Sequence, residues 1–429
     1  MRILVTGATG LIGAQVCARL AAEGHEIFAA SRQKQHPPTG PVRRWLQVDF
    51  TGALEPSVWA PHLHGVDAVV NCVGVLQDSP REDTSTAHLH GAAALFRACA
   101  EAGVRRVIHF SAIGVDRHQE TPFSSTKLAG EKALMALDLD WVILRPSVVL
   151  GQSAFGASAL FRGLAALPVA LEMPGTGPLQ VVVLDDVLDT VSRLVAPDAP
   201  ARVTLDLAGP ERLSMGEVVA LYRGWLGWKP AHRLVLPGWM AGALYRLGDF
   251  AGALGWRPPM RSTARREIVH GAVGDPAHPS GISGITPQSL STALTLRPAT
   301  VQERWFAKLY FLKPVIIVVL VAFWILTGII SLTTGFHKGV DLMLRAGTQM
   351  LAAPGVIAGA LADIIVGLMI AWRPTAWWGL WAAIGLSSFY IIVGTVLLPE
   401  LWREPLGPLL KIWPILMTHF VALAILDER

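Results

Sequence analysis

Four apolar stretches in the last quarter of the sequence constrain the fold more than any other feature. Two of them, residues 314–332 and 376–398, contain no charged side chain over 19 and 23 positions. At 1.5 Å per residue, helices of that length cross about 30 Å of hydrocarbon. The other two, residues 355–372 and 406–425, contain Asp363 and Lys411 respectively, so a buried soluble helix or an interfacial segment stays open for them. We therefore predict a membrane region with four spans.

The distribution of charge separates this region from the rest of the chain. Asp, Glu, Lys and Arg occupy 12 of the 116 positions from 314 to 429, and 56 of the 313 positions before them. Over the whole chain 16% of residues are charged and 52% are hydrophobic, whereas an ordinary soluble domain has about 25% charged residues. Residues 339–351 have the pattern of a short amphipathic helix on a membrane surface. A nearly ordinary soluble part is thus predicted to precede the membrane part.

Net charge and cysteine content restrict the partners and the cellular compartment expected for the soluble part. A net charge of +4 without a long Lys/Arg run argues against a nucleic-acid partner. Three cysteines, Cys17, Cys72 and Cys99, cannot all pair within one chain, which favours a reducing compartment. The first residues do not form a signal peptide, and Lys and Arg beside the spans favour, by six to four, a cytoplasmic amino-terminal part. We expect a multi-pass protein whose soluble part is cytoplasmic.

Residues 1–150 alternate short apolar runs with helical patterns. The runs show little apolar/polar alternation, as expected of strands that are buried on both faces. Strand–helix alternation of this kind predicts a doubly wound parallel sheet, an α/β fold. Strands are expected at residues 3–6, 26–30, 45–48, 68–73, 106–110 and 141–144, and helices at 12–23, 86–102 and 124–137. In the next region we expect helices at 185–194 and 214–226, a strand at 179–183 and a mostly irregular segment at 271–287.

A glycine loop lies directly between the first strand and the first helix. Residues 5–13 read Val-Thr-Gly-Ala-Thr-Gly-Leu-Ile-Gly, with glycines at Gly7, Gly10 and Gly13. Such a loop brings a dinucleotide pyrophosphate to the helix amino terminus, where free N–H groups and the helix dipole stabilise negative charge. The loop residues expected to bind the cofactor are Gly7, Thr9, Gly10, Leu11, Ile12 and Gly13.

The end of the second strand bears on the choice of cofactor. Where an NAD site places an acidic residue to bind the ribose 2′-hydroxyl, this chain has Ser31 and Arg32. A cation suits a 2′-phosphate, so NADP(H) is favoured over NAD(H), unless Arg32 is an ordinary surface residue. Asp49, at the end of the third predicted strand, is placed either to bind the adenine amine or to cap the strand.

These motifs together resemble the atypical short-chain dehydrogenases/reductases. The resemblance rests on the glycine loop, on Asn-Cys-Val-Gly at 71–74, Ser-Ala-Ile-Gly at 111–114 and Ser-Thr-Lys-Leu-Ala-Gly-Glu at 125–131, and on Leu-Arg-Pro-Ser-Val-Val-Leu-Gly at 144–151. The most similar branch includes the NADPH-binding accessory subunit of respiratory complex I and bacterial NAD-dependent epimerase/dehydratase-like proteins. Residues 298–429 resemble the DoxX-like four-helix membrane module that some bacterial members carry.

The resemblance implies a domain plan, a location and a set of site residues. It implies an NAD(P)-binding Rossmann domain at residues 1–155, a smaller lobe at 156–300 and a DoxX-like transmembrane domain at 301–429, in a bacterial inner membrane. In the family a Tyr, a Lys four residues after it and a Ser act on the substrate. Ser111 and Lys127 match the Ser and the Lys, but Phe123 occupies the tyrosine position.

Losing a positioned acid typically costs about 10² to 10⁴ in rate, so catalysis is in doubt. His109, His118 and Ser124 are candidate replacements. Lys127 retains the family role of binding the nicotinamide ribose, and Asn71 and Gly74 are expected to line the cofactor floor. We expect no metal.

Two functional hypotheses remain open. The first is a membrane-anchored reductase that transfers hydride to or from a lipophilic carbonyl or a quinone. The second is a non-catalytic NADPH-binding scaffold or sensor at the lipid bilayer. Within the membrane part, Asp363 is either an interior carboxylate, with His419 as a candidate partner, or a residue near the interface.

Overall fold

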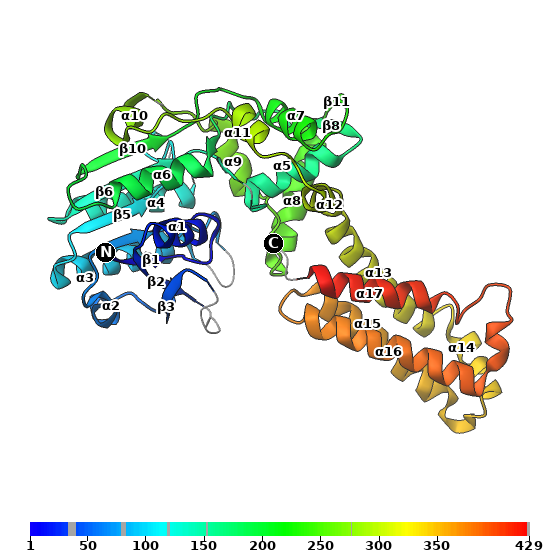
Figure 1. The fold of residues 1–429 in the computed structure, drawn as a ribbon. Coiled ribbons are helices and arrows are strands. Elements are labelled where there is room, and N and C mark those ends of the chain that lie inside the picture. The colour runs from blue at the N-terminus through cyan, green and yellow to red at the C-terminus, as the bar shows by residue number, and fades with distance from the viewer. Residues whose placement is uncertain (33–39, 79–82, 118–120, 152, 276, 427–429) are drawn as a thin grey trace. The chain divides into compact units, whose positions relative to one another are not determined.

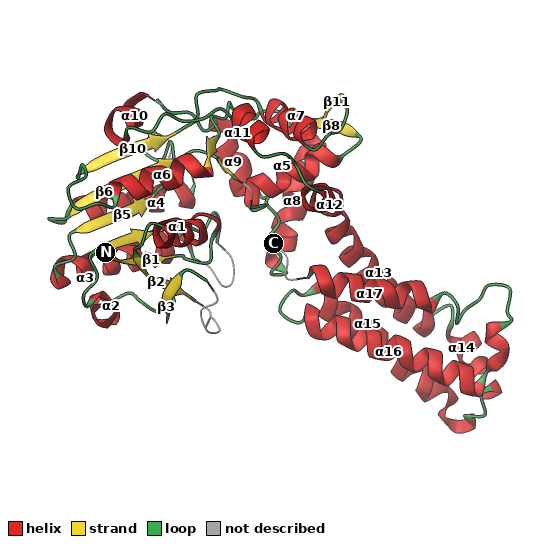
Figure 2. Ribbon diagram, in the orientation of Figure 1, coloured by secondary structure: helices red, strands yellow, loops and turns green. Residues whose placement is uncertain are grey.

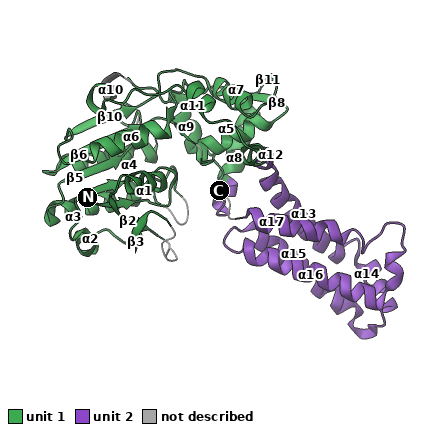
Figure 3. Cartoon of the chain, in the orientation of Figure 1, with its two compact units in different colours: residues 1–249, 258–307 green, residues 250–257, 308–429 purple. Residues whose placement is uncertain are grey.

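The computed structural model describes residues 1–32, 40–78, 83–117, 121–151, 153–275 and 277–426. The chain divides into two compact units (Figure 3). The first unit comprises residues 1–249 and 258–307, and the second comprises residues 250–257 and 308–429.

The first unit is built on a seven-stranded sheet, in which every pairing is parallel (Figures 1 and 2). The strands lie in the order β10-β6-β5-β4-β1-β2-β3. β1 therefore pairs with both β2 and β4, and the chain reverses its direction of winding between β1 and β4. Ligands of such sheets bind outside the carboxyl ends of the strands at this switch point. The strands are β1 (Arg2–Thr6), β2 (Glu26–Ser31), β3 (Val42–Gln47), β4 (Ala68–Asn71), β5 (Arg106–Phe110), β6 (Asp140–Pro146) and β10 (Val203–Leu207).

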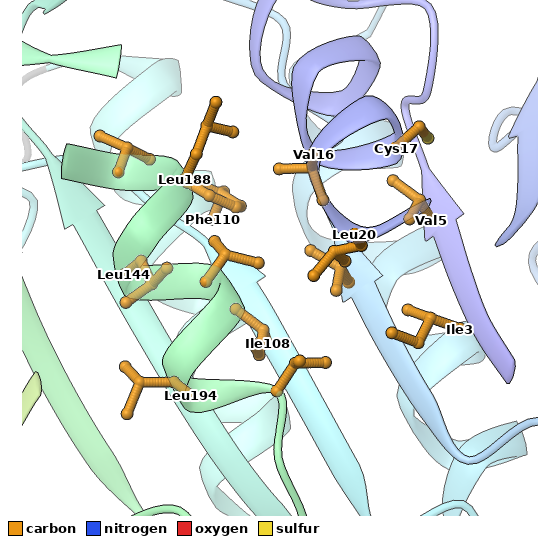
Figure 4. Packing of buried hydrophobic residues seen from close by; sticks show 14 of the residues in the cluster. Ile3, Val5, Val16, Cys17, Leu20, Ile108, Phe110, Leu144, Leu188 and Leu194 are labelled. Atoms are coloured by element: carbon orange, nitrogen blue, oxygen red, sulfur yellow. The ribbon is translucent and has the colours of Figure 1, made fainter. Parts of the chain in front are cut away.

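Helices cover both faces of this sheet. On one face α1 (Leu11–Ala22) and α6 (Leu184–Leu194) pack on Ile3, Val5 and Ile108 among others (Figure 4). On the other face α2 (Pro56–Leu63), α3 (Gly91–Ala102) and α4 (Pro122–Met135) pack on alternate strand residues such as Leu4 and Val107. Because successive side chains point to opposite faces, both cores use the same strands. The predicted doubly wound α/β sheet is confirmed.

The remainder of the first unit is a smaller, mostly helical region. The predicted helices at 185–194 and 214–226 are confirmed by α6 and by α7 (Met215–Trp225), whose Ser214 and Glu217 form a capping box. The predicted strand at 179–183 is shorter, since β9 covers only Val182–Val183, and the predicted irregular segment contains α10 (Ala277–Ser283). The other elements are η1 (Thr86–His90), β7 (Val149–Leu150), α5 (Gly156–Ala166), β8 (Val169–Glu172), β11 (His232–Val235), α8 (Gly238–Ala253), α9 (Ser262–His270), α11 (Leu290–Leu296) and α12 (Val301–Leu309).

The second unit is a helical bundle. Its long apolar helices are α13 (Leu312–Leu332), α15 (Ala352–Ala371) and α16 (Ala376–Leu397). The predicted amphipathic helix at 339–351 corresponds to α14 (Phe336–Arg345) and a turn of 3₁₀ helix, η2 (Gln349–Leu351). Within the described residues, three helices have the length and apolar composition needed to cross a membrane, and the first of these runs back through α12 to Val301.

The fourth predicted span, 406–425, begins later than expected. The helix here is α17 (Ile412–Ile425), whose 14 residues extend about 21 Å. Residues 404–411 read Glu-Pro-Leu-Gly-Pro-Leu-Leu-Lys, and Gly407 has a φ of +54°. The two prolines lack an amide donor and the glycine adopts a left-handed conformation, so a turn interrupts the apolar run before α17 begins.

Candidate functional site

The glycine loop joins β1 to α1 at the switch point of the sheet. Gly7 has a φ of +67°, and a Cβ there would lie 2.8 Å from the carbonyl carbon of Cys72. A Cβ on Gly13 would lie 2.2 Å from the Gly7 oxygen. Only glycine fits either position. Gly10 caps α1 with an ordinary φ of −80° and provides no side-chain cap, so the first amides of α1, from Leu11 to Gly13, face the site without an intrahelical acceptor.

The end of β2 holds the residues predicted to choose between the two cofactors. Ser31 is buried as the last residue of β2, and Arg32 directly after it is exposed. Asp49 lies two residues beyond the end of β3, and its carboxylate accepts a hydrogen bond from the Thr51 amide at 3.0 Å. Asp49 therefore shapes a turn, and its contact with an adenine stays a prediction.

A buried polar network holds the ends of β1, β4 and β5 together. The Asn71 side-chain oxygen accepts from the Thr6 hydroxyl at 2.8 Å and from the Val73 amide at 3.2 Å. The Asn71 amide nitrogen lies 3.2 Å from Nδ1 of His109. Because these hydrogen bonds fix the Asn71 side chain, it orders the floor of the site. Burial lowers the pKa of His109 well below its usual value, which keeps this candidate acid neutral.

Lys127 spans the gap between β4 and β5 from helix α4. Its ammonium donates to the Phe110 carbonyl at 2.7 Å and to the Val73 carbonyl at 3.1 Å. These carbonyls belong to the residues just before Ser111 and Gly74, so the structure brings three predicted site residues together. Burial lowers the pKa of Lys127 to about 8, although Cys72 and Glu131 oppose the shift.

At this edge the Ser111 hydroxyl has unused hydrogen-bonding capacity, and so has Nε2 of His109. Ser111 is 6% exposed, and its Oγ has no hydrogen-bond partner within the part of the chain that the structure describes. Leaving a buried hydroxyl unpaired costs about 1–3 kcal/mol. An unpaired hydroxyl one residue from the carbonyl that holds a buried ammonium fits a ligand oxygen. Together with the amides of Leu11 to Gly13, which lack an intrahelical acceptor, this edge of the sheet fits a nicotinamide dinucleotide.

Phe123 occupies the first turn of α4, four residues before Lys127. Its ring meets the His88 ring edge-on, with the centroids 5.6 Å apart. His88 accepts at Nε2 from the Val75 amide at 2.9 Å, so its Nδ1 carries the proton and donates to the Thr126 hydroxyl, also at 2.9 Å. Burial, then the charge of Lys127, lower the pKa of His88 to about 2. The position of the family tyrosine is thus filled by a ring-to-ring packing contact, and neither ring titrates near neutral pH.

Sequence reasoning did not identify Glu267, which comes from α9. The Ser124 hydroxyl donates to both carboxylate oxygens of Glu267, at 2.8 and 2.9 Å, and the Thr121 hydroxyl also donates to it. The carboxylate lies beside the residue that replaces the family tyrosine, about 140 positions away in sequence. Nothing in the local sequence signals this contact. Of the other candidate acids, Ser124 is committed to Glu267, and His118 lies outside the described residues.

The bundle has its own buried polar pairs. The Tyr390 hydroxyl on α16 lies 2.9 Å from Oδ1 of Asp363 on α15. His419 on α17 instead accepts at Nε2 from the indole N–H of Trp324 on α13, at 2.8 Å. The expected Asp363–His419 pair is therefore replaced by two separate pairs. Across the described residues, no group of three or more His, Cys, Asp and Glu side chains is arranged to hold a metal ion.

Family comparison agrees with this geometry. Residues 3–177 match the model of the NAD-dependent epimerase/dehydratase family, and residues 321–420 match that of the DoxX-like family. The amino-terminal part is an epimerase/dehydratase-family domain. The carboxyl-terminal part is a DoxX-like domain. Both resemblances seen in the sequence are confirmed, and the DoxX-like domain with its apolar helices points to membrane association.

Individual relatives cover only part of the chain. The 40 kDa subunit of NADH-ubiquinone oxidoreductase from Neurospora crassa is 28% identical over 228 residues, which are 50% of this chain and 57% of that protein. A ceramide reductase from Caulobacter vibrioides is 27% identical over 45% of this chain and 60% of its own length. The alignments thus span less than two thirds of either relative.

Solved structures extend the comparison of the fold. The Bordetella bronchiseptica enzyme WbmG, solved in complex with NAD, is 19% identical, with a TM-score of 0.54 over 69% of this chain and 92% of its own. At that identity the likeness shows a shared fold. Together, the epimerase/dehydratase domain and the geometry of its glycine loop support a nicotinamide cofactor.

Proposed function

We propose that this chain is a membrane-anchored NADP(H)-dependent oxidoreductase that reduces a lipophilic, quinone-type acceptor. The observation that carries the proposal is the unpaired Ser111 hydroxyl, one residue from the carbonyl that holds the Lys127 ammonium. The domain plan is a Rossmann domain at residues 1–155, a smaller lobe at 156–300 and a membrane domain at 301–429, in a bacterial inner membrane with the amino-terminal part in the cytoplasm.

The residues of the glycine loop and its surroundings would hold the cofactor. The amides of Leu11, Ile12 and Gly13 bind the pyrophosphate, and Lys127 donates to the nicotinamide ribose. Arg32, exposed after β2, supplies a cation for a 2′-phosphate, which favours NADP(H) over NAD(H). When bound, the reduced nicotinamide supplies a hydride.

The protein supplies no phenol proton, because Phe123 stands where the family has tyrosine. The Ser111 hydroxyl donates a hydrogen bond to the acceptor oxygen and orients it. A quinone that accepts a hydride becomes a weakly basic oxyanion that takes one proton from water. The alkoxide formed from a ketone is far more basic and needs a positioned acid. This chemistry favours a quinone over a carbonyl, and a membrane-anchored protein has lipophilic acceptors available to it in the bilayer.

A second function, a non-catalytic NADPH-binding scaffold or sensor, is favoured by one specific contact. Phe123 packs edge-on against His88, whose two ring nitrogens are both engaged. In this alternative the bound dinucleotide stabilises the Rossmann domain. The similarity to a subunit of NADH-ubiquinone oxidoreductase is compatible with such a role.

The two functions separate in one experiment on the full chain in mild detergent. NADPH binding is followed by nicotinamide fluorescence, and turnover by the absorbance of the reduced nicotinamide with a short-chain quinone or a prenyl aldehyde. The reductase proposal predicts quinone turnover that Phe123→Tyr leaves nearly unchanged and Ser111→Ala reduces. NADPH binding without turnover, in both the natural protein and Phe123→Tyr, establishes the scaffold instead.

Cofactor choice is tested in the same assay. Arg32→Asp should weaken NADPH binding far more than NADH binding, because only NADPH has the 2′-phosphate. Equal weakening of the two cofactors would contradict the preference for NADP(H).

A further inference from the structure

Helix α8 has a solvent-exposed apolar face. Trp239 is 76% exposed and Leu247 is 63% exposed, and Met240 and Leu244 lie on the same side of the helix. The neighbouring strand β11 adds Leu234 and Val235, both at least half exposed. Exposed apolar residues gathered in this way mark sites of contact with a protein or a membrane. We call these six residues the α8 face.

The opposite side of α8 is firmly packed. Ala241 and Tyr245 are buried, and a Cβ on Gly248 would lie 1.8 Å from the Met260 carbonyl oxygen. Asp249 turns inward, where it accepts from the Ser262 amide at 3.1 Å. This packing fixes the rotation of α8 about its own axis, so its exposed apolar side chains face outward.

The charge of α8 suits a lipid surface. Its charged residues are Arg246 and Asp249, and because Asp249 is directed inward, the charge on the outer side is the exposed Arg246. Arg233 on β11 is also largely exposed, although it pairs with Glu172. Exposed Trp and Leu with Arg at their margin are compatible with a helix that lies in the membrane interface, where Arg extends its guanidinium toward the headgroups.

The end of α8 is tied to the membrane bundle. Its last residues and the segment that follows, 250–257, belong to the second unit. Within that unit, the Leu254 carbonyl accepts from the Arg373 amide at 3.0 Å, and the Trp256 indole donates to the Ala371 carbonyl at 2.8 Å. Ala371 ends α15 and Ala376 begins α16, so this turn joins the ends of two apolar helices, where the proposed membrane placement puts the membrane–water interface.

Tryptophans mark that same level. Trp372 and Trp378 are both more than half exposed, as expected of an interfacial aromatic belt. Because α8 has 16 residues, all of it lies within about 24 Å of its attached end. The attachment of α8 to the segment 250–257 and the exposed apolar side chains of α8 both indicate a lipid surface as the partner.

We propose that the α8 face lies in the cytoplasmic headgroup layer of the bilayer that the bundle spans. The contact gives the epimerase/dehydratase domain a further attachment to the membrane, besides the segment 250–257 and the chain that enters α13. The proposal rests on the membrane placement in the proposed function and is independent of whether the protein is catalytic. The partner is lipid rather than a second copy of the chain, because α8 continues directly into the segment 250–257, which is bonded to the turn between two apolar helices.

The test uses single cysteines labelled with an environment-sensitive fluorophore in the full chain, reconstituted in vesicles of phosphatidylcholine and phosphatidylglycerol. Leu247→Cys probes the α8 face. Val58→Cys, at an exposed position of α2, serves as the aqueous control. Val318→Cys, at an exposed position of α13, serves as the bilayer control. Labelling of the unsubstituted protein gives the background, which should be low because burial raises the pKa of Cys17 and Cys99 to about 12 and that of Cys72 well above its usual value.

Quenching by spin-labelled phospholipid is compared with quenching by aqueous iodide. We expect a lipid-to-iodide ratio at position 247 several-fold above that at 58 and below that at 318. A ratio at 247 equal to that at 58 overturns the proposal. Shielding of 247 from both quenchers overturns it in favour of a protein partner such as a second copy. If 318 is not quenched by lipid, the membrane placement itself fails, which separates that failure from failure of the α8 contact alone.

Discussion

Gly10 in the sheet unit and two glycines in the bundle serve different purposes, although Gly7 and Gly13 of the sheet unit also occupy tight positions. In the sheet unit, Gly10 has open space where a side chain would point, apart from the Gly7 oxygen 3.2 Å away. In the bundle, a Cβ on Gly328 would lie 2.5 Å from the Ala360 oxygen, and one on Gly367 would lie 2.6 Å from Ile325. The first leaves backbone amides open to a ligand, and the others let two helices touch.

Buried polar groups differ between the units in the same way. In the bundle, Asp363 and His419 each meet a side chain from a neighbouring helix. At the sheet edge, Lys127 is held by backbone carbonyls while the Ser111 hydroxyl is left unpaired. Among the described residues Nδ1 of His419 is unpaired too, so the contrast rests on the Ser111 hydroxyl, whose unused hydrogen-bonding capacity fits an external oxygen.

The largest effect is expected from Gly10→Glu. A carboxylate at the amino terminus of α1 occupies the pyrophosphate position and repels the phosphates. NADPH binding should weaken by about a hundredfold or more, about 2.7 kcal/mol, as measured by nicotinamide fluorescence.

Gly224→Glu is the matched control, because Gly224 lies in the same unit with nothing near the position of a Cβ. The control variant should bind NADPH normally. Undiminished binding by Gly10→Glu would remove the dinucleotide from this loop.

Gly328→Val should instead destabilise the bundle. The added side chain meets backbone, and overpacking of this kind typically costs about 1–3 kcal/mol. The midpoint of thermal unfolding in detergent should fall, while NADPH binding at temperatures below the transition stays unchanged. Gly385→Val, at a bundle position with open space, should leave the midpoint nearly unaltered. An equal fall in both variants would show that Gly328 has no special packing role.

The sheet and its glycine loop were predictable because their signals are local. A strand, three glycines and a helix occur in consecutive residues, and the strand expected at 106–110 coincides with β5. The Ser124–Glu267 contact joins residues that only the tertiary fold brings together. The late start of α17 has a local cause in Pro405, Gly407 and Pro408, which hydropathy alone does not register. The Asp363 partner depends on how helices rotate against one another, which periodicity does not determine.

Lys127 predicts a pH dependence of cofactor binding. With its pKa lowered to about 8, the ammonium is present at neutral pH and lost at higher pH, so NADPH affinity should fall severalfold from about pH 7 to about pH 9. Lys127→Met should bind more weakly and lose this pH dependence. If the natural protein binds NADPH equally well at both pH values, Lys127 does not contact the cofactor as an ammonium.

Stability of the cofactor-free protein should change in the opposite direction. The folded chain releases the Lys127 proton near pH 8, while the unfolded chain keeps it to about 10.5. Between those values the unfolded state binds more protons, so this group makes the free energy of unfolding rise with pH.

The smallest effect is expected from Tyr390→Phe. Removing the hydroxyl deletes the hydrogen bond to Asp363, and side-chain hydrogen bonds in membrane bundles average about 0.6 kcal/mol. Thermal unfolding in detergent should shift slightly, with NADPH binding unchanged. Loss of NADPH binding in this variant would contradict the assignment of cofactor binding to the sheet unit alone.

Hydrogen–deuterium exchange of the full chain, with and without NADPH, tests that assignment most directly. The account predicts slower amide exchange in three places: residues 7–13, the ends of β4 and β5, and the first turns of α4. Exchange in α13, α15 and α16 should stay unchanged. Protection confined to the bundle, or an unchanged glycine loop at saturating NADPH, would contradict the account.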